Sequence, residues 1–206
     1  MSTYAILTNN RTKKKLVYYP CPKNANTSVK MFLAKHLNIE KDYLFIGDAV
    51  PQKNQTADHY AEKKNIIKII PSKQPFQKID VDVKCCLVRD PIRRFISAYK
   101  NRIIYHGDPQ FKNHTIDMIL DKLEDNKFEN KHFLPQVYFL GNNLDYYTFW
   151  SFTDQINIFV EKVNEFFEKK IDFPRIQTGG SDIKINLNKS QIDRIEKIYI
   201  NDFKLI

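Results

Sequence analysis

The stretch YYPCPKNANTSVKMFLAKHL, residues 18–37, predicts the fold class of this chain. An apolar, aromatic run from Leu16 to Tyr19 is typical of a short strand, and Pro20 ends it. After a polar turn, the side chains of one helical face recur at Val29, Phe32, Leu33, His36 and Leu37. A strand that leads through a turn into a helix is the repeating unit of an α/β fold.

The polar turn between this strand and this helix carries groups that suit an anion. The first turn of a helix offers backbone N–H groups and the positive end of the helix dipole. Lys23 adds a full positive charge, while Thr27 and Ser28 add hydroxyl donors. Asn24 and Asn26 belong to the few residue types that tolerate a left-handed backbone, which we expect in such a loop. The turn therefore predicts a site for a phosphate-like group, although a simple helix cap beside a solvated lysine would use the same residues.

A second unit of the same kind lies at residues 84–103, KCCLVRDPIRRFISAYKNRI. Asp90 is a suitable N-cap and Pro91 suits the first helical position. Arg89 directly follows the strand, at the carboxyl end of the sheet, where α/β proteins bind ligands. We expect Arg89 and Ser97 to hold a second phosphate.

The other two basic side chains of this helix face have a plainer interpretation. Arg94 and Lys100 are predicted to form a solvated helix surface. The two strand-to-helix units together predict an α/β fold with a central parallel sheet flanked by helices. At 206 residues the chain is expected to form a single domain, 1–206.

Further elements are indicated by local signals. An apolar run at 66–70 predicts another strand, and Thr115 and Asp154 are expected to cap two helices. Ser190 with Asp193 resembles a capping box at the start of the last helical region.

Composition excludes several classes of protein. Lys and Arg number 33 against 24 Asp and Glu, which favours anionic ligands. No apolar run is long enough to span a membrane, and the N-terminus lacks a secretory pattern. Three cysteines without CxxC spacing argue against a disulfide framework or a zinc site. These features predict a cytoplasmic protein.

Four segments resemble, in the same order, motifs of the sulfotransferases that use 3′-phosphoadenosine 5′-phosphosulfate (PAPS). The first two are the turns already described, and the last two resemble the HWxPQ and IYxxDFxLF segments of the carbohydrate sulfotransferase branch. They are PKNANTS (22–28), CLVRDPIRRFISAYKNRI (86–103), KHFLPQ (131–136) and KIYINDFKLI (197–206).

The resemblance implies a fold related to P-loop nucleotide kinases, with PAPS lying across both turns. It implies that Arg89 and Ser97 contact the 3′-phosphate. The 5′-phosphosulfate would be held by Lys23, Asn24, Ala25, Asn26, Thr27 and Ser28. The segment YYTFWSFTD, residues 146–154, departs from the family's GRFE-like pattern, so contacts to the adenine are not predicted.

Sulfuryl transfer to a hydroxyl needs a cation and a base. Lys23 is placed to stabilise the charge that grows on the bridging oxygen of the leaving group. His59 and His132 are the two candidate histidine bases, and a carboxylate base is the third possibility. No metal is required.

The predicted function is sulfation of a carbohydrate or glycolipid hydroxyl. A P-loop-like kinase is the alternative enzyme, but the GxxxxGK[ST] pattern is absent. A basic nucleic-acid-binding module is the alternative from another class, and no motif of that class is present, so no nucleic-acid partner is expected.

Overall fold

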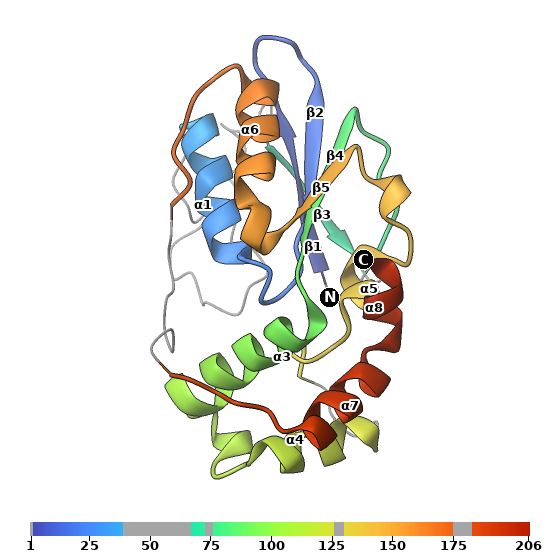
Figure 1. Ribbon diagram of the computed structural model, residues 1–206. Coiled ribbons are helices and arrows are strands. Elements are labelled where there is room, and N and C mark those ends of the chain that lie inside the picture. The colour runs from blue at the N-terminus through green and yellow to red at the C-terminus, as the bar shows by residue number, and fades with distance from the viewer. Residues whose placement is uncertain (1, 39–66, 73–75, 126–129, 175–182) are drawn as a thin grey trace.

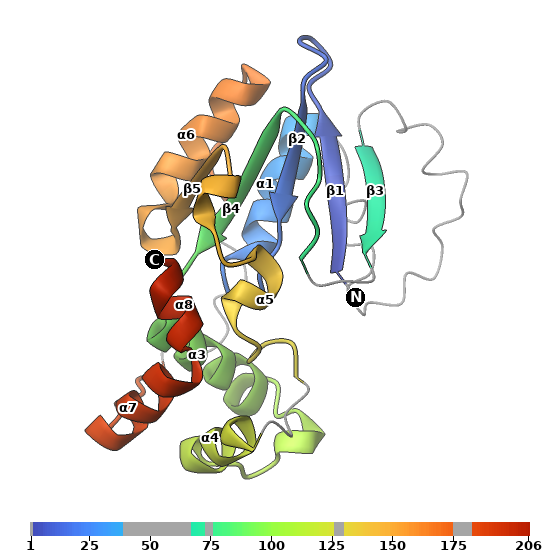
Figure 2. The same ribbon diagram turned by 90° about the vertical axis from the view of Figure 1, so that its right-hand side faces the viewer.

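The computed structural model describes residues 2–38, 67–72, 76–125, 130–174 and 183–206. Its centre is a five-stranded sheet in the order β3-β1-β2-β4-β5, which Figure 2 shows from the side. The strands are β1 (Ser2–Thr8), β2 (Lys15–Tyr19), β3 (Ile67–Ser72), β4 (Val83–Val88) and β5 (Phe149–Phe152).

Helices cover both faces of this sheet and its carboxyl end. In Figure 1, α1 and α6 lie on one face, α5 and α8 lie toward the other, and α3, α4 and α7 lie beyond the ends of β2 and β4. The α-helices are α1 (Asn26–Leu37), α3 (Pro91–Tyr99), α4 (Ile116–Glu124), α5 (Gln136–Leu140), α6 (Ile156–Phe167), α7 (Lys189–Ile198) and α8 (Ile200–Leu205). A π-helical turn, η2 (Lys100–Tyr105), continues α3, and short 3₁₀ turns occupy η3 (Pro109–Phe111), η4 (Leu144–Tyr146) and η5 (Thr153–Gln155).

The α/β fold class is confirmed. β2 pairs in parallel with β4, and β4 pairs in parallel with β5. β1 was not predicted. It forms a hairpin with β2, so these two strands are antiparallel, and it also pairs antiparallel with β3. The sheet is therefore parallel from β2 to β5, next to the predicted site, and antiparallel from β3 through β1 to β2.

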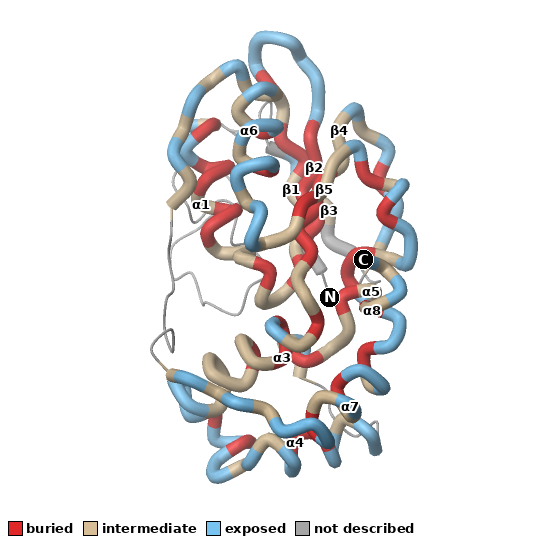
Figure 3. Tube along the Cα trace, in the orientation of Figure 1, coloured by how far each residue is buried: buried red, intermediate tan, exposed pale blue. Residues whose placement is uncertain are grey.

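The strands around the site are buried on both faces. Every residue from Cys85 to Val88 in β4 is buried. Figure 3 shows buried residues in red along the centre of the sheet. One apolar cluster joins the sheet to α1 and α6, a second lies on the opposite face with α5, and a third joins α3, α4 and α7. A parallel strand covered on both sides reads as a continuous apolar run, which explains the sequence KCCLV.

Two of the predicted helix starts are confirmed, and a third differs. The Asp90 carboxylate accepts a hydrogen bond from the Arg93 N–H (2.8 Å), and the Thr115 hydroxyl accepts one from Met118 (3.3 Å). Asp154 is not a cap, because it lies inside the 3₁₀ turn η5 and Gln155 is the N-cap residue of α6. Its carboxylate instead pairs with Arg93 at 2.9 Å.

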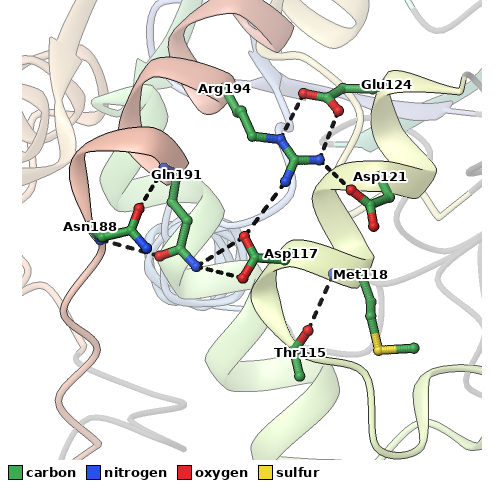
Figure 4. Close-up of polar contacts among 8 residues, drawn as sticks. All are labelled: Thr115, Asp117, Met118, Asp121, Glu124, Asn188, Gln191 and Arg194. Carbon is green, nitrogen blue, oxygen red and sulfur yellow. Dashed lines mark hydrogen bonds and ion pairs between the residues drawn. The ribbon is translucent and has the colours of Figure 1, made fainter.

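The predicted capping box at Ser190 and Asp193 is wrong. The box lies two residues earlier, because Asn188 is the last residue with an extended backbone (φ −80°, ψ 168°), and Gln191 completes it. Figure 4 shows how this end of α7 is also tied to α4 by Gln191 and Arg194. Their carboxylate partners are Asp117, Asp121 and Glu124.

Candidate active site

The two predicted phosphate turns lie side by side. They follow the carboxyl ends of β2 and β4, which are parallel neighbours paired at Tyr19 and Cys86. The Arg89 guanidinium, from the second turn, donates through Nη1 to the carbonyl oxygen of Lys23 in the first (2.9 Å). The sheet therefore brings together two segments that are 66 residues apart in sequence.

The backbone of the first turn differs from the prediction. Lys23 (φ 71°) and Ala25 (φ 56°) are left-handed, whereas Asn24 and Asn26 have no positive φ. Ala25 is the N-cap residue of α1, and Asn26 is its first helical residue. A left-handed residue followed by a right-handed one directs successive N–H groups toward a common point, which suits an anion. The backbone of the turn therefore suits an anion, as expected, but the left-handed residues are Lys23 and Ala25 instead of Asn24 and Asn26.

The side chain of Asn24 links the first turn to the end of β4 and to Gln136. It is completely buried, and its Nδ2 donates to the Leu87 carbonyl and to Gln136 Oε1, both at 2.7 Å. The backbone N–H of Asn24 donates to Cys21 at 3.2 Å. These contacts account for the amide nitrogen of Asn24, whereas its Oδ1 has no hydrogen-bond partner among the described residues. The direct phosphosulfate contact predicted for Asn24 stays untested.

The other residues predicted to bind phosphate lie on the two helices that follow these turns. Thr27 is half-buried and Ser28 is buried in the first turn of α1. Ser97 is half-buried in the second half of α3, and it is not part of the helix start.

Gln136, the last residue of the KHFLPQ segment, joins the two turns. Its Oε1 accepts hydrogen bonds from Asn24 Nδ2 (2.7 Å) and from the Arg89 N–H (2.9 Å). Its Nε2 donates to the Arg89 carbonyl at 2.7 Å. The side chain is completely buried, so these bonds do not compete with water.

The C-terminal segment reaches the same network through Asp202. Its carboxylate accepts hydrogen bonds from the Gln136 N–H (2.7 Å) and the Val137 N–H (2.9 Å) at the start of α5. Burial raises the pKa of this carboxyl, while the two N–H donors lower it. All four motif segments therefore meet at one place in the fold.

Arg94 does not form a solvated helix surface, so that prediction is wrong. The side chain is 2% exposed, and its Nε donates to the Pro22 carbonyl at 3.0 Å. Its Nη2 has no hydrogen-bond partner among the described residues. Lys100, assigned to the same surface, is half-buried. Arg94 faces inward because the first turn and the C-terminal helices cover this side of α3.

Positive charge gathers around Lys23. Burial, followed in order of effect by the charges of Arg89, Arg102 and Arg94, lowers the pKa of Lys23 to about 8. The Arg102 guanidinium is held in place by both oxygens of Asp108, from Nε (2.7 Å) and Nη2 (2.6 Å). Of these four cations only Arg102 forms an ion pair among the described residues, and such a cluster favours binding of a multiply charged anion.

Comparison with known proteins agrees with this geometry. The model of the sulfotransferase family matches residues 8–205, which is nearly the whole chain. This protein belongs to the sulfotransferase family. No curated protein and no solved structure matches the chain.

Of the two candidate histidine bases of this sulfotransferase, only His132 lies among the described residues. His132 is half-buried, and burial followed by the charges of Lys23 and Arg102 lowers its pKa to about 3. His59 lies outside the described residues. His36 packs in the core, with its ring stacked on Phe167 at a centroid distance of 4.8 Å.

Four residues of the site had no role in the sequence prediction: Arg94, Arg102, Gln136 and Asp202. The motifs contain all four, but nothing local distinguishes a buried arginine or glutamine from a solvated one. Within the described ranges, no three His, Cys, Asp or Glu side chains gather as metal ligands would. None of the described helices has the length and apolar composition needed to cross a membrane.

Proposed function

We propose that this sulfotransferase moves a sulfuryl group from PAPS to a hydroxyl of a carbohydrate or glycolipid acceptor. The observation that carries the proposal is the pair of adjoining helix-start turns with Lys23, Arg89, Arg94 and Arg102 around them. PAPS carries negative charge at both ends, on its 5′-phosphosulfate and on its 3′-phosphate. Two anion-binding turns side by side match that distribution.

Each turn has a separate part in this proposal. The backbone from Asn24 to Asn26, with Lys23 and the hydroxyls of Thr27 and Ser28, would bind the 5′-phosphosulfate. Arg89 and Ser97 would bind the 3′-phosphate. We further propose that residues 1–206 act as one domain in the cytoplasm.

The reaction is a displacement at sulfur. The acceptor oxygen forms a bond to sulfur while the bond from sulfur to the bridging oxygen breaks, and adenosine 3′,5′-bisphosphate leaves. Lys23 stabilises the negative charge that builds on the bridging oxygen. A base takes the proton of the acceptor hydroxyl, and His132, neutral at pH 7, supplies that function.

Thermal-shift measurements test the proposed donor. A ligand at a hundredfold excess over its dissociation constant adds ~2.7 kcal/mol to the free energy of unfolding. We expect this from adenosine 3′,5′-bisphosphate, with much smaller shifts from ATP and from a short oligonucleotide. Stabilisation by ATP and not by the bisphosphate would favour a kinase, and stabilisation by the oligonucleotide alone would favour a nucleic-acid-binding protein. Transfer of label from [³⁵S]PAPS to a panel of sugars then tests the acceptor class.

Removal of the Arg89 side chain should weaken bisphosphate binding. We expect Arg89→Ala to cost ~1.5–3 kcal/mol, the usual range for a lost hydrogen bond to a charged group. Adenosine 5′-monophosphate, which lacks the 3′-phosphate, should lose less. Calorimetry with both nucleotides measures the difference, and Arg93→Ala, which removes an exposed arginine of the same helix, is the matched control. An unchanged preference for the bisphosphate in Arg89→Ala would show that this arginine does not bind the 3′-phosphate.

A further inference from the structure

We propose that Gln136 sets the distance between the two phosphate-binding turns and thereby makes the protein selective for a nucleotide that carries phosphate at both ends. This inference rests on the proposed function, because it assumes that one nucleotide lies across both turns. It assigns a positioning role to a residue that does not itself need to contact the ligand.

The hydrogen bonds of Gln136 give the first argument. One amide group holds the second turn on both sides of Arg89, by accepting from its N–H (2.9 Å) and donating to its carbonyl (2.7 Å). The same Oε1 accepts from Asn24 in the first turn (2.7 Å). Because Asn24 also donates to Leu87 at the end of β4 (2.7 Å), the two turns and the strand end form one connected unit.

The side-chain type gives the second argument. The position needs an acceptor for two N–H groups and a donor for one carbonyl within a single planar group. Glutamate offers no donor, methionine offers neither function, and asparagine is one methylene shorter. Only glutamine satisfies all three bonds at this length.

The bracing of Gln136 from behind gives the third argument. Asp202 accepts from the backbone N–H groups of Gln136 and Val137, at 2.7 and 2.9 Å. Tyr199, on the same C-terminal segment, donates its hydroxyl to the Phe133 carbonyl at 2.6 Å. Both acidic and phenolic groups are buried, so the segment that carries Gln136 is held rigidly against the C-terminal helices.

A rigid spacing affects ligands according to how many turns they engage. A nucleotide with one phosphate uses one turn and is insensitive to the distance to the other. A nucleotide with a phosphate at each end gains from its second contact only when both turns are already placed correctly. Loss of Gln136 should therefore weaken the bisphosphate selectively.

The test compares Gln136→Met with the wild type by calorimetry, using adenosine 3′,5′-bisphosphate, adenosine 5′-monophosphate and adenosine 3′-monophosphate. We expect the affinity for the bisphosphate to fall at least tenfold more than the affinity for either monophosphate. The matched control is Gln191→Met, the same substitution at a buried glutamine of α7, whose side-chain hydrogen bonds go to Asn188 and Asp117 rather than to either turn. It should lower the melting temperature and leave the ratio of affinities unchanged.

Several outcomes decide the matter. The inference is overturned if Gln136→Met keeps the wild-type ratio within twofold, or if Gln191→Met changes the ratio equally. If Gln136→Met does not fold, Asp202→Asn replaces it, and we expect the ratio to fall at least threefold; an unchanged ratio there overturns the inference. A wild-type protein without preference for the bisphosphate would overturn the proposed donor as well, which separates the two failures.

Discussion

Lys23→Met is expected to lower the single-turnover rate by ~10²–10³-fold, the loss typical when one preorganised transition-state donor is removed. The negative charge on the bridging oxygen grows during sulfuryl transfer, so the missing cation matters most in the transition state. Donor affinity should fall much less. The helix start of α1 and the guanidinium of Arg89 still favour the ground-state anion.

Single-turnover kinetics with saturating PAPS and an accepted sugar isolates the chemical step. Lys35→Met is the matched control, because it makes the same substitution at an exposed position of α1, the helix that follows the turn of Lys23. A near-normal rate in a folded Lys23→Met protein would reduce this lysine to a solvated loop residue. It would also remove the main mechanistic support for the proposed function.

The pH dependence gives Lys23 an independent signature. Its pKa is lowered to about 8, so the side chain is charged at pH 7 and loses its proton as the pH rises through 8. We expect kcat/KM, which reports groups of the free enzyme, to fall above about pH 8 in the wild type. Lys23→Met should lack this fall. A lysine with an ordinary pKa would give no change below pH 9.5.

His132→Ala is the second large effect that we expect, with turnover slowed by ~10²-fold or more and bisphosphate binding nearly unchanged. In the structure without nucleotide, burial and neighbouring cations lower the pKa of His132 to about 3, so the imidazole is neutral and able to accept a proton. PAPS bound as proposed would bring negative charge beside Lys23, which acts in the opposite direction. It would raise the pKa of the imidazole toward the value that suits a base.

His59→Ala is the companion variant for this prediction, since the two histidines lie in different segments. We expect it to change mainly the KM for the acceptor. The roles would be reversed if His59→Ala lost turnover and His132→Ala kept it. Near-normal turnover in both variants with saturating acceptor would point to a carboxylate base.

Local signals in the sequence were sufficient for much of the fold. Asp90 and Thr115 cap their helices as predicted, because a cap depends on residues within one turn of the helix. The strand predicted at 66–70 corresponds to β3, with bounds shifted to Ile67–Ser72. The antiparallel β1 was missed, because its pairing depends on a hairpin partner and on β3, far along the chain.

The backbone of the first turn shows where local propensity fails. Asparagine tolerates the left-handed region better than lysine or alanine, so Asn24 and Asn26 were the expected left-handed residues. The structure places Lys23 and Ala25 there instead. The side chain of Asn24 is needed for buried bonds to Leu87 and Gln136, and these outweigh the small intrinsic preference.

The sequence by itself determined that two strand-turn-helix units each carry an anion-binding turn, because each unit is specified by residues adjacent in the chain. Only the tertiary structure decided how the turns are joined. Arg94 donates a hydrogen bond to the carbonyl oxygen of Pro22, which is 72 residues away in sequence. Asp202 accepts one from the N–H of Gln136, which is 66 residues away. Whether such a polar side chain is solvated or buried depends on which distant segment covers it, and burial is what turns an ordinary glutamine or arginine into part of the site.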